Sequence, residues 1–326
     1  MKVSVVIPVY NVGDYIKECL DSVFCNKSCQ FDLEVIVVDD GSFDETKGIL
    51  DEYSKCYDFT YLYQDNAGQS AARNVGKSIA TGEYLLFVDA DDVINPNLIS
   101  RCLRIFAEYN VDMVAFDGTA FFDSNVNLDD IDNDFNDLSR APELYNLVMN
   151  TRDFFNVSVK KNCFNVQPCL YVVKSKKVCD VFFENGIVYE DNLYTTDVLL
   201  NSSVNNIFCL EEKLYQRRVR NNSTVTMKKN LNHFFSYLVV YDTLVSRKAL
   251  LDKVSMYSTF CSRILALAGK EISLLDELDL LSRIKLISYV LARCFTRPKI
   301  ISLRVLASIF LGKGYVYLVN FLKREN

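Results

Sequence analysis

Three carboxylates directly after a short apolar run are the residues of this sequence best suited to chemistry. Residues 85–88 are all apolar, and Asp89, Asp91 and Asp92 follow them. Such a run is typical of a strand buried on both faces, and ligands of open α/β sheets bind beyond the carboxyl ends of the strands. Neighbouring carboxylates repel one another unless a cation or hydrogen-bond donors compensate their charge. The pattern therefore indicates either a site for Mg²⁺ or Mn²⁺, which take oxygen ligands, or an acidic turn before a helix.

A second acidic pair, Glu190 and Asp191, stands at the start of a segment with helical periodicity. The apolar residues that follow recur at helical spacing: Leu193, Tyr194, Val198 and Leu199. Carboxylates at a helix N-terminus are stabilised by the helix dipole, so a capping role explains the pair as well as a catalytic one does. The residues alone leave both roles open.

Strands and amphipathic helices alternate over about the first 117 residues. The runs predict strands at residues 3–9, 33–38, 59–63, 84–88 and 111–116, with helices between them. Two helices have start signals: Ser42 with Glu45 three residues later is a capping-box pattern, and Asn95 with Pro96 is an N-cap pattern. The alternation predicts an α/β fold with a mostly parallel sheet, whose strand ends collect at one edge.

The pattern after residue 117 is less regular. Residues 118–140 are acidic and predict a surface loop, whereas residues 166–173 and 213–219 predict strands. Everything beyond about residue 230 is helical in pattern. His233 is the only histidine and lies outside every motif, so we expect no catalysis by histidine.

The composition is that of a globular protein with an uneven charge distribution. The net charge of −6 argues against a general nucleic-acid binder. Residues 281–326 hold nine Lys or Arg against Glu325 alone, so this tail carries +8 and the rest of the chain −14. The eleven cysteines lack zinc-ligand spacing and are typical of a reducing, cytoplasmic compartment. We expect no signal peptide, because Pro8 and Asn11 interrupt the first apolar run and no small-residue cleavage site follows. We expect no transmembrane helix, because no apolar run reaches 18 residues.

Five motifs together resemble those of family 2 glycosyltransferases, which have the GT-A fold. They lie at residues 5–11, 37–42, 68–74, 87–92 and 189–191, in the order and rough spacing of the family. The resemblance implies a Rossmann-like, nucleotide-sugar-binding domain at residues 1–225, with a nucleotide-binding half (1–117) and an acceptor half (118–225). It does not extend to the helical region at residues 226–326.

The resemblance also implies which residues bind the nucleotide. Pro8, Tyr10 and Asp40 would flank or hydrogen-bond the nucleotide base, with Asp39 as a close alternative to Asp40. Arg73 would face the nucleotide or its phosphates.

Further residues would act on the sugar diphosphate. Asp89 would reach the ribose, and Asp91 would hold the Mn²⁺ or Mg²⁺ ion that bridges the diphosphate. Asp191 would be the general base, with Glu190 as the alternative. The loop after residue 219 either closes over the diphosphate or is an ordinary basic loop; its candidate residues are Arg220 and Ser223.

The function implied is inverting, metal-dependent transfer of one sugar from a nucleotide-diphosphate sugar, a UDP-sugar, to a hydroxyl of a glycan or lipid-linked acceptor. Such a reaction belongs to bacterial surface polysaccharides such as capsule or O-antigen. The chain has no Trp, so it lacks the QxxRW signature of processive synthases. One alternative is a sugar-phosphate nucleotidyltransferase, which would need a glycine-rich basic loop after the first strand. The other is a non-catalytic nucleotide-sugar-binding scaffold.

The C-terminal region alternates short apolar groups with bases from residue 284 onward. These groups are too short to span a bilayer but suit helices that lie in its interface, where anionic lipid attracts Lys and Arg. The pattern predicts a peripheral protein at the inner face of the plasma membrane. The alternative is a helical bundle that packs on the catalytic domain.

Overall fold

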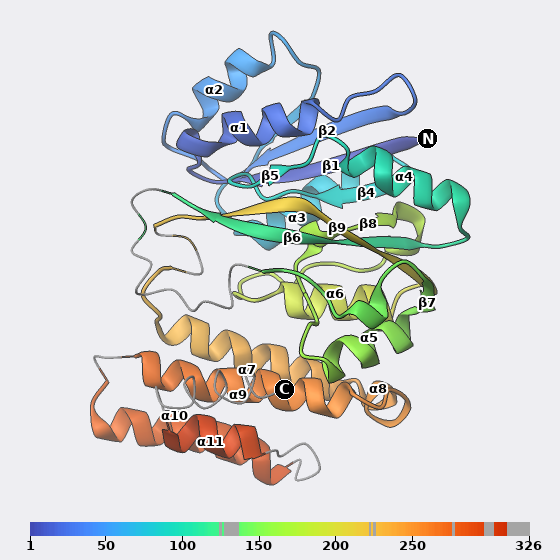
Figure 1. Cartoon of the computed structure of the whole chain (residues 1–326). Coiled ribbons are helices and arrows are strands. Elements are labelled where there is room, and N and C mark those ends of the chain that lie inside the picture. The colour runs from blue at the N-terminus through green and yellow to red at the C-terminus, as the bar shows by residue number, and fades with distance from the viewer. Residues whose placement is uncertain are drawn as a thin grey trace. The chain divides into compact units, whose positions relative to one another are not determined.

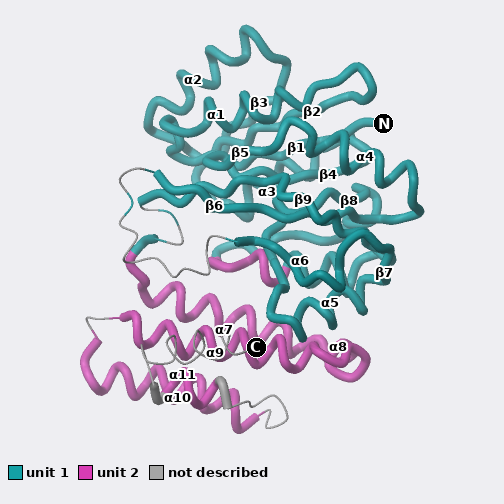
Figure 2. Tube along the Cα trace, in the orientation of Figure 1, with its two compact units in different colours: residues 1–186, 194–227 teal, residues 187–193, 228–326 magenta. Residues whose placement is uncertain are grey.

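The computed structural model describes residues 1–123, 126, 137–221, 223, 226–275, 278–296 and 303–311. Two compact units make up the chain (Figure 2). The first contains residues 1–186 and 194–227, and the second contains residues 187–193 and 228–326. The second unit thus includes a short segment, residues 187–193, from the middle of the region that the sequence assigns to the catalytic domain.

The first unit is built on one nine-stranded sheet (Figure 1), counted over the described residues. Its strand order is β3-β2-β1-β4-β8-β6-β9-β5, and β7 also pairs with β9. The strands are β1 (Lys2–Val9), β2 (Asp32–Asp39), β3 (Thr60–Tyr63), β4 (Tyr84–Phe87), β5 (Val93–Ile94), β6 (Met113–Phe122), β7 (Val148–Asn150), β8 (Tyr171–Lys174) and β9 (Asn206–Val219).

The predicted α/β fold with a mostly parallel sheet is confirmed. Strands β1 to β4 pair in parallel, as do β6 and β9. Strand β8 runs antiparallel to both β4 and β6, so β6 and β9 point the same way as β1 to β4. Strands β5 and β7 pair antiparallel with β9. The carboxyl ends of β1, β2 and β4 therefore meet at one edge of the sheet.

Helices cover both faces of the sheet because its central strands are apolar on both sides. Val5 and Ile7 of β1 share a core with α1 and α4, whereas Val6 faces α3 on the opposite side. On α3 the small Gly76 lies so close to Val6 that an added Cβ would be 2.4 Å from its Cγ1. The helices are α1 (Gly13–Phe24), α2 (Thr46–Tyr53), α3 (Gln69–Ile79), α4 (Leu98–Glu108), α5 (Thr151–Lys160) and α6 (Asp191–Leu200).

The second unit is helical, as the sequence predicts. Helix α7 begins with a capping box, in which the Asn230 side chain accepts from the His233 N–H and the His233 ring pairs with the Asn230 backbone. The described helices are α7 (Leu231–Ser246), α8 (Lys248–Lys253), α9 (Tyr257–Leu274), α10 (Leu280–Thr296) and α11 (Leu303–Leu311). None of them combines the length and the apolar character needed to cross a bilayer.

The first predicted helix start is wrong. Helix α2 begins at Thr46, and Ser42 does not cap it. The Ser42 hydroxyl instead accepts a hydrogen bond from the Asn11 N–H at 3.0 Å. The Asp44 carboxylate accepts a hydrogen bond from the Thr46 N–H at 3.1 Å. A long-range contact between two loops has replaced the local cap, which the pattern of one segment does not reveal.

The second predicted helix start is wrong by two residues. Helix α4 begins at Leu98, and the Asn95 side chain accepts from the Asn97 N–H in the turn before it. The short strand β5 pairs with β9 just before this turn and fixes where the chain can leave the sheet. A two-residue strand is too short to show a periodicity.

Three other segments differ from the prediction in their boundaries. Residues 118–122 of the predicted acidic loop belong to β6, and most of the remainder, residues 124–125 and 127–136, lies outside the described residues. The predicted strand 166–173 becomes a 3₁₀ turn at Pro168–Leu170 followed by β8. The strand predicted at 213–219 is the end of β9, which begins seven residues earlier.

Candidate active site

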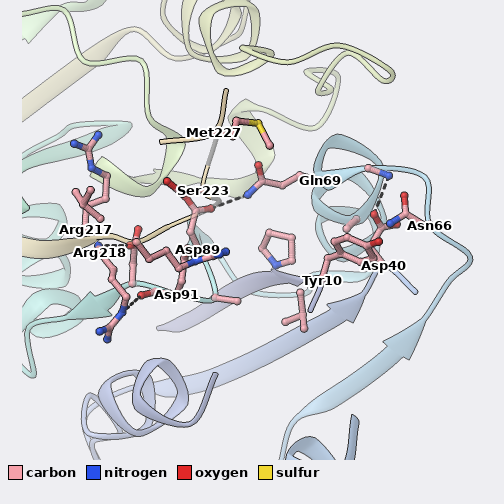
Figure 3. A pocket seen from close by; sticks show the side chains of 18 residues that line it. Tyr10, Asp40, Asn66, Gln69, Asp89, Asp91, Arg217, Arg218, Ser223 and Met227 are labelled. Atoms are coloured by element: carbon pink, nitrogen blue, oxygen red, sulfur yellow. Dashed lines mark hydrogen bonds and ion pairs between the residues drawn. The ribbon is translucent and has the colours of Figure 1, made fainter. Parts of the chain in front are cut away.

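A cavity of about 480 Å³ opens at the carboxyl ends of β1, β4 and β9 (Figure 3). This is the edge where the sequence places the ligand. The predicted site residues that line the cavity are Pro8, Tyr10, Asp40, Asp89, Asp91, Arg220 and Ser223. The fold thus brings four separate segments of the chain to one cavity.

Asp40 lies on the cavity wall and holds the loop before α3 in place. Its carboxylate accepts from the Gln64 side-chain amide at 2.6 Å, and from the N–H groups of Ala67 and Gly68 at 2.8 Å each. Only 3% of Asp40 is exposed. Gly68 has a φ of +91°, a conformation that favours glycine and that lets the loop turn into α3. Asp40 therefore shapes this end of the cavity as well as lining it.

Asp39 is fully buried and does not line the cavity. Its carboxylate accepts from the Ser42 N–H at 2.8 Å and from the Tyr61 hydroxyl at 2.9 Å. These bonds tie the end of β2 to its turn and to β3. Asp40 lines the cavity and Asp39 does not, so Asp40 is the better candidate of the two for contact with a nucleotide base.

Arg73 lies behind the cavity wall rather than on it. Its Nη2 donates to Asp89 Oδ1 at 2.6 Å, while the guanidinium lies 5.2 Å from the centre of the Phe183 ring. Arg73 is 3% exposed and Asp89 is 27% exposed at the side chain. The Gln69 amide also donates to Asp89, at 3.2 Å. Arg73 thus orients Asp89 and is not among the residues that line the cavity. Its expected role toward the nucleotide or its phosphates stays a prediction.

Asp91 faces the cavity and forms an ion pair with Arg220. Arg220 Nε donates to Asp91 Oδ2 at 2.7 Å, and both side chains are 20% exposed. Burial raises the pKa of Asp91; Arg220 opposes this shift and the charge of Asp89 adds to it. A partly exposed carboxylate that lacks full charge compensation fits a divalent cation, which supplies positive charge and prefers hard oxygen ligands.

Asp92, the third carboxylate of the acidic cluster and one to which the resemblance assigns no role, is buried. Its carboxylate accepts from the Tyr215 hydroxyl at 2.6 Å and from the Arg218 N–H at 2.7 Å. Burial and the charges of Asp91 and Asp89 raise the pKa of Asp92 well above its usual range. Asp92 therefore joins the end of β4 to β9.

Asp92 also belongs to a group of side chains whose spacing could hold a metal ion. Ligand atoms of Asp89, Asp92 and Cys169 all lie within 4.8 Å of one another. However, burial raises the pKa of the Cys169 thiol well above its usual value, and a thiol is a soft ligand. This group therefore fits Mg²⁺ or Mn²⁺ less well than the oxygen ligand of Asp91 does.

Arg218 is another cavity residue that the sequence reasoning missed. Its Nε donates to the main-chain oxygen of Asp91 at 2.9 Å, and its Nη1 donates to Asp123 at 2.9 Å. All four residues at 217–220 line the cavity, so the basic run at the end of β9 was the available signal.

Residues 4–166 match the family model described as glycosyl transferase family 2. The match covers half of the chain. The chain belongs to this family.

Curated relatives agree with this assignment over different lengths. GlyA, a glycosyltransferase of Streptococcus pneumoniae, is 37% identical over 38% of this chain, but the match spans only 18% of the relative. The poly(ribitol-phosphate) β-glucosyltransferase of Bacillus spizizenii is 41% identical over 35% of this chain and 18% of its own length. YibD, an uncharacterised glycosyltransferase of Escherichia coli, is 28% identical over 81% of this chain and 76% of the relative.

Solved structures share the fold at low sequence identity. TarS of S. aureus, residues 1–349 in complex with UDP-GlcNAc, has a TM-score of 0.63 at 20% identity and covers 89% of this chain and 79% of its own. The mannosyltransferase PcManGT of Pyrobaculum calidifontis, in complex with GDP-Man and Mn²⁺, has a TM-score of 0.55 at 16% identity and covers 97% and 84%.

In this family 2 glycosyltransferase Asp191 is the first residue of α6, at the predicted position. Its Oδ1 accepts from the Asn192 N–H at 2.9 Å and from the Asn192 side-chain amide at 3.0 Å. Asp191 and Glu190 belong to the helical unit, together with the rest of residues 187–193. A catalytic role for the pair stays a prediction.

Proposed function

We propose that this glycosyltransferase moves one sugar from a nucleotide-diphosphate sugar, a UDP-sugar, to a hydroxyl of a glycan or lipid-linked acceptor, with inversion. The main support for this proposal is the kind of side chain that lines each end of the cavity. Pro8, Tyr10 and Asp40 offer an aromatic and a hydrogen-bonding wall of the kind that suits a base. Asp91 and Arg220 offer charged groups of the kind that suit a diphosphate and its counter-ion.

Asp91 is the residue that would hold Mn²⁺ or Mg²⁺. When bound, the ion supplies positive charge that stabilises the leaving nucleoside diphosphate. Arg220 is already on the cavity wall, and its guanidinium can hydrogen-bond phosphate oxygens once Asp91 has another partner. Ser223 lines the same wall and adds a hydroxyl. Asp89, oriented by Arg73, would bind the ribose.

Asp191 would act as the general base, with Glu190 as the alternative. Its carboxylate takes the proton of the acceptor hydroxyl, while the acceptor oxygen bonds to the anomeric carbon of the donor sugar. The bond from that carbon to the diphosphate breaks, and the electron pair leaves with the nucleoside diphosphate. Attack from the face opposite the leaving group inverts the anomeric configuration.

The first experiment is a ligand panel. We expect the melting temperature to rise with one of UDP-GlcNAc, UDP-glucose, UDP-galactose and GDP-mannose, and to rise further when Mn²⁺ is added. Incubation of that donor with candidate acceptors, followed by NMR of the product, then gives the anomeric configuration. Binding of a donor without transfer to any acceptor would favour the scaffold, and retention of configuration would contradict inversion.

We also propose that the enzyme works in surface-polysaccharide synthesis, at the inner face of the plasma membrane. The name of the Bacillus spizizenii relative, a poly(ribitol-phosphate) β-glucosyltransferase, supports a polymeric acceptor. Helix α10 supports membrane docking through exposed apolar side chains, with Leu280 at 73%, Leu281 at 78% and Phe295 at 82% exposure. Of the predicted basic residues, Arg297, Lys299 and those beyond residue 311 lie outside the described residues.

A further inference from the structure

Tyr189 directly precedes Glu190 and Asp191, the two candidates for the general base, and it has an unusual backbone conformation. Its φ is +68°, in the left-handed region that bulky residues rarely occupy. Such a conformation persists only where the surrounding structure holds it, and it is found often at functional sites. The contacts that hold Tyr189 therefore determine how the chain enters Glu190 and Asp191.

Two helices of the second unit supply these contacts. The Tyr189 ring stacks on Tyr237 of α7, with centroids 4.1 Å apart and planes 18° from parallel. The Tyr189 hydroxyl donates to Glu271 Oε1 of α9 at 3.3 Å. One residue earlier, the Val188 N–H donates to the Ser236 hydroxyl of α7 at 3.1 Å. Side chain and backbone of the segment are thus both fixed by the helical unit.

Glu271 is buried with only part of the hydrogen-bonding capacity of its carboxyl group used. It is 5% exposed, and its buried Oε2 has no hydrogen-bond partner among the described residues. Burial raises its pKa, while Lys229, the Tyr189 hydroxyl and Lys270 act in the opposite direction. A buried carboxyl oxygen without a hydrogen-bond partner costs free energy of folding. The hydrogen bond that Glu271 does accept comes from the Tyr189 hydroxyl, so the described contact of this carboxyl group is with the segment before Asp191.

The charge of Asp191 also reaches this cluster. Burial raises the pKa of Tyr189 well above its usual value, and the charges of Glu271 and Asp191 add to the shift. The same two carboxylates add to the raised pKa of Tyr237. The Asp191 carboxylate therefore lies near enough to Tyr189 and Tyr237 for its charge to affect their hydroxyl groups.

We propose that Glu271 and Tyr237 are positioning residues for the general base. Through Tyr189 they fix the backbone from which Asp191 is presented, so the helical unit is part of the catalytic apparatus. This inference rests on the proposed role of Asp191 as the base.

The test measures transfer kinetics, with the donor found in the ligand panel, for full-length Glu271→Leu, Glu271→Gln and Tyr189→Phe. We expect Glu271→Leu and Tyr189→Phe to lower kcat about tenfold with donor KM unchanged, because each removes one hydrogen bond to a charged group. Glu271→Gln keeps an acceptor for the hydroxyl and should stay near wild type. Ser273→Ala is the matched control, since the Ser273 hydroxyl donates to the Lys270 carbonyl within the same helix.

The decisive comparison combines Glu271→Leu with Asp191→Asn. If Glu271 acts through the base, the double variant is no slower than Asp191→Asn alone. A full further tenfold loss, a change in KM only, or wild-type kcat in Glu271→Leu would overturn the positioning role. A fully active Asp191→Asn variant would instead contradict the base assignment itself. Tyr189→Phe removes a single oxygen, so it carries the test if Glu271→Leu melts early.

Discussion

At the scale of single residues, the site depends on which carboxylates are already compensated. Asp40 and Asp92 have hydrogen-bond donors on both oxygens, and Arg73 pairs with Asp89. Asp91 has Arg220 as its charged partner, and burial still raises its pKa. Among the four carboxylates of the cavity wall, Asp91 therefore gains most from an added cation.

We predict that Asp91→Asn removes most transfer activity and weakens binding of the nucleotide sugar. Loss of a charged oxygen ligand would reduce the affinity for Mn²⁺, and the leaving diphosphate would lose its counter-charge. Turnover and the Mn²⁺-dependent rise in melting temperature measure the two effects. Wild-type activity in this variant, or in the native enzyme with excess chelator, would contradict the proposal that Asp91 binds a metal ion.

For the proposed base, we predict that Asp191→Asn lowers turnover about 10²–10⁴-fold, the usual size of a general-base contribution. Donor binding should survive, because the residues proposed to bind the nucleotide lie elsewhere in the chain. Glu190→Gln is the matched control. If Glu190→Gln is inactive and Asp191→Asn is active, the assignment is wrong by one residue.

At the scale of elements, close packing of α3 on the sheet places the loop that leads into this helix, of which Asn66 and Gly68 line the cavity. We predict that Gly76→Ala destabilises the protein by about 1–3 kcal/mol, because the new Cβ would overlap Val6 and must displace it. Gly48→Ala on α2 is the control: no atom lies within 4 Å of its added Cβ, and helix propensity should stabilise it by up to about 1 kcal/mol. Urea unfolding measures both, and equal stabilities would contradict the close contact.

A second prediction at this scale concerns Glu34 of β2. Burial opposes ionisation, but hydrogen bonds from Lys2, Ser4 and Thr81 outweigh it and lower the pKa of Glu34 to about 2. A depressed carboxylate pKa adds stability above its unfolded value, near 4.3, and this stability disappears as the pH falls toward 2. Glu34→Gln should therefore cost about 1–3 kcal/mol at pH 7 and much less near pH 2. Urea unfolding at both values checks this, and a cost independent of pH would contradict it.

At the scale of the whole molecule, the helical unit has two proposed tasks, to position the base and to dock on the membrane. Two of its described bases are engaged internally: Arg283 donates to the carbonyls of Ile272 and Leu275, and Arg293 pairs with Asp242. Docking through α10 therefore depends strongly on its exposed apolar residues.

We predict that the full chain co-sediments with vesicles rich in anionic lipid at low salt, and that Leu280→Ser with Leu281→Ser reduces the bound fraction several-fold. Each leucine would bury apolar surface in the lipid interface. Leu147→Ser, a change at another exposed leucine, is the control. If the native chain does not bind such vesicles, the membrane-docking proposal for the helical unit is wrong.

The sequence alone determined the fold class, the family and the edge of the sheet where the site lies. These follow from local signals: buried strand runs such as residues 84–88, helical spacing, and acids placed directly after strands. A parallel sheet aligns its strand ends, so the order of the elements was enough to gather Pro8, Asp40 and Asp91 on one cavity.

Only the tertiary structure decided what each polar side chain does. Asp39 and Asp40 are neighbours with the same chemistry, yet one is fully buried beneath its turn and the other lines the cavity. Arg73 was expected to face the nucleotide or its phosphates, and the structure adds an ion pair with Asp89, sixteen residues away, that the sequence did not reveal. Hydrogen bonds and ion pairs depend on which distant segments of the chain meet, and the periodicity of a single segment does not show this. For this reason the sequence did not reveal the contacts of Tyr189 with α7 and α9.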